Sequence, residues 1–135
     1  MSEETIFTKI INREIPAHIV YEDDDHLAFL DISPFEKGHT LVIPKKHYTT
    51  IMEMPEDAFL SLMSVVYRLA KHFEDQLDCG INIWQNNKEI AHQEVGHVHF
   101  HLIPRREKKK TYCLENRDSY EEGEDKQYAD MLRLT

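Results

Sequence analysis

The sequence has few cysteines, few basic residues and no long apolar run. Its two cysteines, Cys79 and Cys113, lie far apart and form no Cys-x-x-Cys pair, which predicts free thiols in a reducing compartment, the cytoplasm. The first ten residues, MSEETIFTKI, lack both a basic start and an apolar stretch, so we expect neither a secretion signal nor a membrane span. With 16 Lys and Arg against 25 Asp and Glu, the net charge is −9, which argues against a general nucleic-acid or anionic membrane surface.

The 135 residues fit one folded domain followed by a charged extension. The composition changes after Pro104, where the basic run RREKKK precedes a stretch rich in acidic residues. We therefore predict a domain over 1–105 and a tail over 106–135, whose last ten residues can form a helix. Because charge runs of this kind are usually solvated, we expect the tail to be an extension in solvent.

Three histidines alternate with apolar residues in the stretch HVHFHLIPR, residues 97–105. A helix would scatter His97, His99 and His101 around its axis, whereas a strand places them on one side and the apolar residues on the other. The outer two would lie about 13 Å apart, so all three cannot bind one metal ion, although a neighbouring pair could. Three imidazoles packed in an ordinary core would each need a hydrogen-bond partner, so the set indicates a functional site.

Two helices are predicted from the spacing of apolar residues. The stretch ETIFTKIIN, residues 4–12, has helical spacing and is stopped by Pro16. A long helix is predicted over 55–77, with Pro55 at its first position and Gly80 as the residue that ends it. Its buried stripe is predicted to contain Phe59, Leu62, Met63, Val66, Ala70, Phe73 and Leu77.

Strand-like stretches occur at five places, 18–22, 26–32, 39–44, 80–86 and 97–105. In the second of them Leu27, Phe29 and Asp31 share a face, so an aromatic ring and a carboxylate lie side by side. A polar loop, NKEIAHQEVG, joins the last two strands. The predicted fold class is α+β, with five strands, one long helix and a short N-terminal helix.

The run from His97 to Ile103 resembles the histidine triad signature, and all seven of its positions match. The stretches IFTKIINREIPAHIVYEDDDHLAFLDISP, GHTLVIPKKH and NIWQNN resemble further segments of the same HIT family in the same order, so the resemblance covers residues 5–105. The likeness is closest to the Hint branch and its bacterial relatives, which are nucleoside phosphoramidate and nucleotide hydrolases. It implies a five-stranded antiparallel sheet and a two-fold homodimer joined through the long helix and an edge strand.

The resemblance also implies a site for a purine nucleotide. Asp31 is expected to hold the ribose hydroxyls, because a carboxylate can accept hydrogen bonds from both, and Asn86 is expected near the ribose and phosphate. The residues implied around the base are Ile6, Phe7, Ile10, Ile15, Phe29 and Ile32. Apart from the resemblance, this apolar set would be read as plain core.

In the implied chemistry, His99 is the nucleophile that attacks the α-phosphorus and forms a nucleotidyl-histidine, which water then hydrolyses. An imidazole suits this role because it is largely neutral at pH 7. His101 and Gln93 correspond to donors on the phosphate oxygens, where charge must be stabilised in the transition state. His97 and His39 match positions that support the triad by hydrogen bonding.

Several positions depart from the family pattern. Many bacterial relatives use a Cys-x-x-Cys pair in a structural zinc site, but this chain has Thr5 and Thr8 there, so we expect no metal and no cofactor. Lys88 and His92 replace glycines of the relatives, which changes the loop over the phosphate. Glu94 stands in the nucleotide site where the eukaryotic Hint type has Ser or Thr, so handling of the leaving group is expected to differ.

Three functions follow from these observations. The favoured one is a hydrolase or transferase acting at the α-phosphate of a phosphoramidate, an acylated nucleotide or a dinucleoside polyphosphate. The second is a nucleotide-binding or interaction protein with little turnover, which the sequence does not separate from the first. The third is a metal-dependent protein that uses two of the alternating histidines with His39 or His47.

Overall fold

The computed structural model describes residues 4–108 and 117–134. Within them, five strands form one antiparallel sheet in the order β1-β2-β3-β5-β4. The strands are β1 (Ile19–Glu22), β2 (His26–Leu30), β3 (Thr40–Pro44), β4 (Gly80–Gln85) and β5 (Phe100–Arg105), and the α helices are α1 (Ile6–Ile11), α2 (Glu56–Leu77) and α3 (Glu124–Leu132). The predicted α+β class with a five-stranded antiparallel sheet is confirmed.

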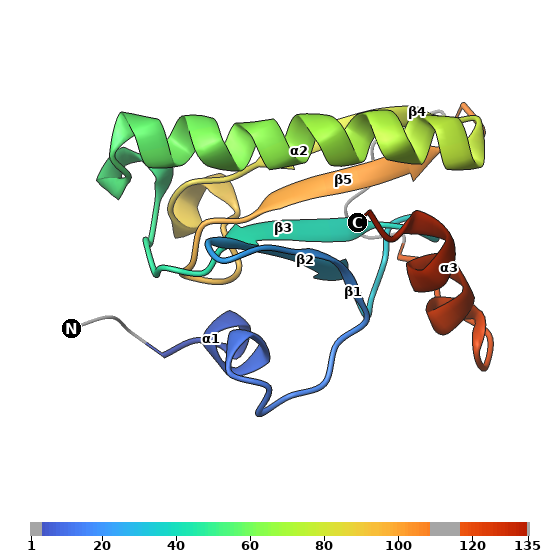
Figure 1. Cartoon of the computed structure of the whole chain (residues 1–135), viewed down its shortest axis with the longest axis horizontal. Coiled ribbons are helices and arrows are strands. Elements are labelled where there is room, and N and C mark those ends of the chain that lie inside the picture. Colours follow the sequence, from blue (N-terminus) through green and yellow to red (C-terminus); the bar gives the residue numbers. More distant parts are fainter. Residues whose placement is uncertain (1–3, 109–116, 135) are drawn as a thin grey trace.

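The sheet is covered on both faces. Helix α2 lies along one face and the short helix α1 lies on the opposite side (Figure 1). Beneath α2, Leu69 and Phe73 of the helix and Leu102 of β5 belong to the larger core. Beneath α1 lies a smaller core of Phe7, Ile10, Leu27, Phe29, Leu41 and Ile43. The face of β2 that carries Leu27 and Phe29, predicted from alternation, therefore meets α1.

Helix α2 begins at Glu56, directly after Pro55. The acidic Glu56 and Asp57 stand in its first turn, where negative charge complements the helix dipole. The helix ends because Asp78 adopts the left-handed conformation, with φ of 48°. Gly80, the predicted terminator, is instead the first residue of β4, so that prediction is wrong; aspartate is one of the few residues that tolerates this conformation.

The buried stripe of α2 is rotated slightly from the predicted one. Leu62, Val66 and Phe73 are buried as predicted, but Val65 and Leu69 are buried as well. The other predicted members, Phe59, Met63, Ala70 and Leu77, are only partly buried against the same core. Helix α2 contacts α3 in addition to the sheet.

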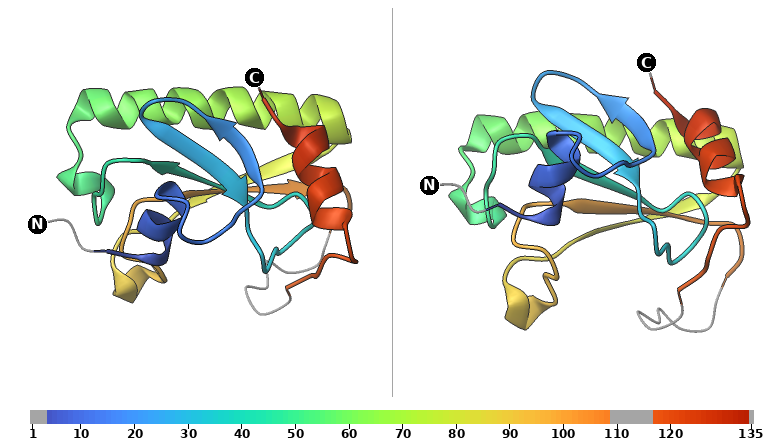
Figure 2. Two further views of the ribbon diagram at one scale, coloured as in Figure 1. Left: turned by 60° about the horizontal axis from the view of Figure 1, so that its bottom comes forward. Right: turned by 90° about the horizontal axis from the view of Figure 1, so that it is seen from below.

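Residues 117–134 pack against the domain. Helix α3 contacts α2, β1 and β2, and its Ala129 and Leu132 are buried in the larger core. The backbone N–H of Leu134 donates to the carbonyl of Val20 at 2.8 Å. Figure 2 shows α3 beside one end of α2. The expected helix is present, but a wholly solvated tail is wrong for this part, because its apolar residues complete the core.

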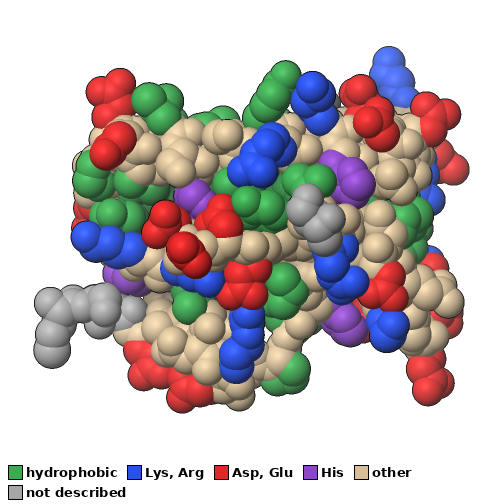
Figure 3. All heavy atoms as spheres, in the orientation of Figure 1, with side chains coloured by type: hydrophobic (Ala, Val, Ile, Leu, Met, Phe, Trp, Pro, Cys, Tyr) green, Lys and Arg blue, Asp and Glu red, His purple; other side chains and the backbone are tan. Residues whose placement is uncertain are grey.

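The described surface carries mixed charge. On the face drawn in Figure 3, Lys and Arg side chains are interspersed with Asp and Glu. Within residues 4–108 and 117–134, no helix combines the length and apolar character that crossing a membrane requires.

Candidate active site

The three alternating histidines lie at the start of β5, but only His101 belongs to the strand. The predicted strand over 97–105 is therefore too long at its beginning. Upstream of Phe100 the backbone leaves its partners, and the N–H of Val98 donates instead to the carbonyl of Tyr48 at 2.8 Å. The chain stays extended enough to keep the imidazoles together, since the rings of His99 and His101 have centroids 4.9 Å apart.

The side of the chain that carries the histidines is itself buried. The ring of Phe7, from α1, meets His97 and His99 edge-on, with centroids 5.8 and 5.1 Å apart. His97 is fully buried and His99 is 4% exposed. The imidazoles therefore lie in a layer between the sheet and α1. Because they are buried, each ring needs a hydrogen-bond partner.

A hydrogen-bonded chain determines which nitrogen of His101 carries a proton. The backbone N–H of Phe35 donates to Nδ1 of His39 at 3.1 Å, so the proton of His39 must lie on Nε2. That Nε2 lies 2.9 Å from Nδ1 of His101, which therefore accepts. Neutral His101 is left with its proton on Nε2, and it presents an N–H donor at the site.

His99 has the opposite arrangement. Its Nδ1 lies 2.8 Å from the carbonyl oxygen of His97, which can only accept, so Nδ1 carries the proton and Nε2 keeps its lone pair. His97 in turn donates from Nε2 to the carbonyl of Pro44 at 2.8 Å. The site thus places a nucleophilic nitrogen of His99 beside the N–H donor of His101.

Burial keeps the site histidines neutral. Desolvation is the main cause of lowered pKa values, to about 4 for His97 and about 3 for His101. It also lowers the pKa of His99, and it brings that of His39 well below the ordinary value. At pH 7 the rings act as neutral donors, acceptors or nucleophiles.

A cavity of about 270 Å³ opens beside the histidines. The predicted residues that line it are Ile6, Phe7, Ile10, Ile15, Phe29, Asp31, Ile32, Glu94, His99 and His101. His39 and His97 lie behind this lining, where they contact His101 and His99. The apolar pocket, the carboxylate and the imidazole pair therefore come from α1, β2 with the residues after it, and the start of β5.

Asp31 follows the last residue of β2 and is mostly buried. Its Oδ1 accepts from the backbone N–H of Ser33 at 2.8 Å, and its Oδ2 lies 3.8 Å from Nε2 of His39. Burial raises the pKa of this carboxyl, while the Ser33 N–H and the cation of Arg117 oppose that shift. The carboxylate lies at the edge of the apolar pocket.

Two predicted residues do not line this cavity. The side chain of Gln93 donates to the carbonyl of Thr49 and accepts from the N–H of Lys88, each at 2.6 Å. It therefore connects the 87–96 loop to the segment that contains Thr49. Asn86 donates to the carbonyl of His92 at 3.4 Å. Lys88 and His92 both have positive φ, 76° and 69°, in the region of backbone conformation that favours glycine.

The sequence reasoning missed Arg117 in this site. It lines the cavity, and its Nη1 lies 3.5 Å from Oδ2 of Asp31. Nothing in its local pattern separates it from the other charged residues of the tail, so only the three-dimensional structure reveals it.

Three side chains at the site, those of Asp31, His39 and His101, each offer an atom that could bind a metal ion. Single ligand atoms of Asp31, His39 and His101 lie within 4.8 Å of one another. A divalent ion there would have to break the hydrogen bond between the two histidines and share Asp31 with the cation of Arg117. The absence of zinc at Thr5 and Thr8 stays a prediction, and the hydroxyls of these two residues cap α1.

Comparison with known proteins identifies the family. The HIT domain model matches residues 12–108. An uncharacterized HIT-like protein of Methanocaldococcus jannaschii is 54% identical over 102 residues, which are 76% of this chain and 79% of that protein. An adenosine 5'-monophosphoramidase of Saccharomyces cerevisiae is 48% identical over 104 residues, which are 77% of this chain and 64% of that protein.

The fold agrees along nearly the whole chain with a solved structure. A crystal structure of a HIT-like protein from Bartonella henselae, obtained with an unknown ligand, superposes with a TM-score of 0.86 at 35% identity. The superposition covers 98% of this chain and 97% of that one. Sequence match and shared fold together show that this chain belongs to the HIT family.

Proposed function

We propose that the protein is a nucleotide hydrolase that acts at the α-phosphate of a purine nucleotide derivative. The observation that supports this most strongly is the pair of opposite tautomers, with the bare Nε2 of His99 beside the N–H of His101. A nucleophile next to a fixed donor is the arrangement that displacement at phosphorus requires.

The rest of the pocket suits the rest of a nucleotide. Ile6 and Ile32 are 48% and 86% exposed although they are apolar, so a flat purine between them and Phe29 would cover surface that now faces water. Asp31 offers carboxylate oxygens to the ribose diol at the edge of this surface. Base, ribose and phosphate would then follow one another along the cavity.

In the proposed reaction, Nε2 of His99 attacks the α-phosphorus as the bond to the leaving group breaks. The leaving group departs with the bonding pair and takes a proton from solvent. The ring that forms carries a positive charge, which the hydrogen bond from Nδ1 to the carbonyl of His97 stabilises. Water then attacks phosphorus and gives one proton to solvent as the P–N bond breaks, and the bonding pair returns to Nε2, which releases the nucleoside monophosphate with neutral His99.

The favoured substrate is a nucleoside phosphoramidate. The Saccharomyces cerevisiae relative is named an adenosine 5'-monophosphoramidase, and its similarity to this chain supports the same class here. Acylated nucleotides and dinucleoside polyphosphates share the α-phosphate and are the remaining substrates to test. A panel of adenosine and guanosine phosphoramidates beside dinucleoside polyphosphates would identify the leaving group by relative kcat/KM.

A single-turnover experiment tests the intermediate. With α-labelled phosphoramidate and rapid acid-free quenching, the wild type should carry label on histidine, and His99→Ala should carry none. Because base and ribose contacts lie elsewhere, His99→Ala should still bind the monophosphate. If His99→Ala keeps more than about a tenth of the wild-type kcat, the assignment of the nucleophile is wrong.

We also propose that the protein is a homodimer. Strand β4 is an edge of the sheet, and its Ile83 is 46% exposed. In α2, Leu60 and Tyr67 are 58% and 62% exposed. Leu60 and Tyr67 are seven residues apart and therefore share a face of the helix. A second copy would cover these side chains and extend the sheet. Light scattering that gives only the 16.0 kDa monomer at micromolar concentration would exclude this dimer.

We propose the cytoplasm as the place of action. Among the described residues Cys79 is a free thiol, and burial raises its pKa, so it is weakly reactive there. Fractionation of cells with an antibody against the protein tests this location.

A further inference from the structure

Arg117 enters the nucleotide cavity from a part of the chain beyond the HIT domain match, which ends at residue 108. Its guanidinium stacks on the ring of Phe35, with Cζ 4.0 Å from the centroid. Its Nη1 donates to the carbonyl of Ser33 at 2.6 Å. The side chain is 26% exposed, so a large part of the cation is held against the protein.

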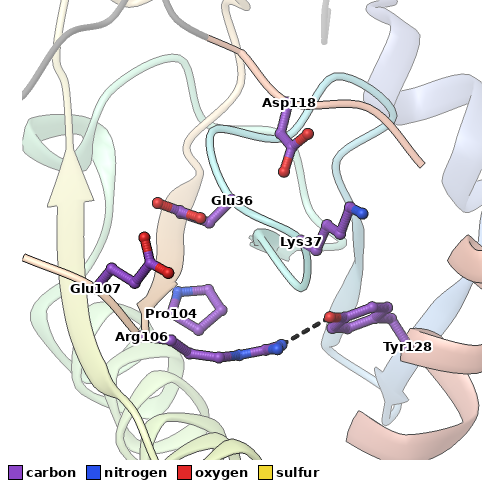
Figure 4. A pocket seen from close by; sticks show the side chains of 7 residues that line it. All are labelled: Glu36, Lys37, Pro104, Arg106, Glu107, Asp118 and Tyr128. Carbon is purple, nitrogen blue, oxygen red and sulfur yellow. Dashed lines mark hydrogen bonds between the residues drawn. The ribbon is translucent and has the colours of Figure 1, made fainter. Parts of the chain in front are cut away.

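The backbone next to Arg117 is anchored to the loop between β2 and β3. The N–H of Asp118 donates to the carbonyl of Pro34 at 2.6 Å, and the hydroxyl of Tyr120 accepts from the N–H of Gly38 at 2.9 Å. Lys37 of the same loop forms an ion pair with Glu124 at 3.0 Å. Figure 4 shows Asp118 beside this loop, in a neighbouring pocket. These contacts place Arg117 at the cavity independently of its own side chain.

Apart from Arg117, the described residues that line the cavity bring no permanent positive charge to it. Among its described lining residues, Arg117 is the only Lys or Arg, while Asp31 and Glu94 are acidic. The two lining histidines have lowered pKa values and are neutral at pH 7. An anionic phosphate therefore meets two carboxylates and one cation, in a protein of net charge −9.

The partners of the guanidinium differ in how firmly they hold it. Nη1 is engaged by the carbonyl of Ser33 and faces Asp31 at 3.5 Å. Among the described residues, Nη2 faces only Glu94, at 3.8 Å, which is beyond hydrogen-bond distance, and the Glu94 side chain is 77% exposed. An exposed pair at this distance is weak, so the Nη2 side can exchange Glu94 for another anion at little cost.

We propose that Arg117 is a substrate-binding residue that holds the anionic phosphate of the nucleotide, with Nη2 exchanging Glu94 for a phosphate oxygen. The proposal rests on the proposed nucleotide site and adds to it a specificity for nucleotides over nucleosides. Because arginine donates two parallel hydrogen bonds, Nη1 can stay on Ser33 while Nη2 turns to phosphate. The tail is then a functional part of the active site.

Calorimetric titration of AMP and adenosine into wild type, Arg117→Gln and Arg117→Lys tests this proposal. Arg117→Gln should weaken AMP binding about tenfold, which equals about 1.4 kcal/mol, and change adenosine binding less than about twofold. Arg117→Lys should keep part of the AMP affinity, because it keeps the charge but loses the planar stack on Phe35. Salt should weaken AMP binding more in wild type than in Arg117→Gln.

Arg106→Gln is the matched control. Arg106 is also a basic residue after β5, but it lines the neighbouring pocket and bonds the hydroxyl of Tyr128, as Figure 4 shows. This variant should bind both ligands like wild type. The role of Arg117 would be overturned, with the proposed function still standing, by any of three results for Arg117→Gln: unchanged AMP affinity, equal losses of affinity for AMP and adenosine, or tighter binding of either ligand. Wild type that binds neither ligand would overturn the proposed function and this inference together.

Discussion

Nε2 of His39 lies 2.9 Å from Nδ1 of His101, and the proton between them belongs to His39. This follows because Nδ1 of His39 already accepts the backbone N–H of Phe35. His39 is fully buried, so no water competes for this bond. His39 therefore fixes the proton of His101 on Nε2, the nitrogen that donates into the site.

Replacing His39 by Leu should lower kcat by about 10- to 100-fold, the usual effect of removing a group that orients a functional side chain. Without the donor, the proton of His101 can move to Nδ1, and Nε2 then repels the phosphate oxygens. His39→Gln is the matched control, because its amide N–H can still donate to His101. Steady-state kinetics with the substrate that wild type cleaves measures the effect, and far-UV circular dichroism checks the fold. Equal kcat values for Leu and Gln variants would remove His39 from this positioning role.

The local pattern around the triad predicted much of the site, while distant contacts were not predictable. Alternation in HVHFHLIPR placed the imidazoles on one side, and the face shared by Phe29 and Asp31 put the carboxylate beside the apolar pocket. These relations depend on period and residue type, which a sequence displays. The tautomers of His39 and His101 depend on a backbone N–H four residues away from His39, and no pattern encodes that contact.

The tail illustrates the same limit. Its charge suggested a solvated extension, yet Ala129 and Leu132 are buried and Arg117 reaches the cavity. A few apolar residues within an acidic stretch have no visible partner until the sheet and α2 are in place. The end of α2 at Leu77 agrees with the prediction, but the residue that ends it was assigned wrongly, since Asp78 rather than Gly80 takes the left-handed conformation that glycine usually adopts.

Thr5 and Thr8, where the resemblance led us to expect no zinc site, form the N-terminal cap of α1. The hydroxyl of Thr5 accepts from the N–H groups of Phe7 and Thr8, and the hydroxyl of Thr8 accepts from the N–H of Thr5. Thr5→Ala should therefore lower the free energy of unfolding by about 1 kcal/mol, while Thr5→Ser should be nearly neutral. Treatment with EDTA should leave the Tm unchanged. A fall of Tm in EDTA, with about one zinc per chain by elemental analysis, would show that metal stabilises the fold.

Acid should destabilise the protein through its buried histidines. The folded pKa values of His97 and His101, about 4 and about 3, lie below the ordinary value near 6.5 that the unfolded chain has. Between these values the unfolded state binds more protons, so the free energy of unfolding should fall as the pH drops below about 6.5, by about 1.4 kcal/mol per pH unit for each histidine. Urea unfolding at fixed protein concentration from pH 7.5 to 5 measures this slope. His97→Asn should reduce this slope by the contribution of one proton, about 1.4 kcal/mol per pH unit. A free energy of unfolding that does not change with pH in wild type would contradict the burial of these histidines in the neutral form.

Ribose should matter more to binding than the identity of the purine. One oxygen of the Asp31 carboxylate accepts from the Ser33 N–H, and its remaining lone pairs can accept from a 2',3'-diol. In the proposed binding mode the base would instead meet the apolar side chains that line the cavity. A 2'-deoxynucleotide should bind at least several-fold more weakly than the ribonucleotide, since a hydrogen bond to a charged group contributes about 1.5 to 3 kcal/mol. Asp31→Asn keeps the shape and the bond from Ser33 but replaces an acceptor by a donor, so it should lose the preference. Calorimetry with AMP, GMP and dAMP measures both effects, and equal affinity of wild type for AMP and dAMP would place the ribose away from Asp31.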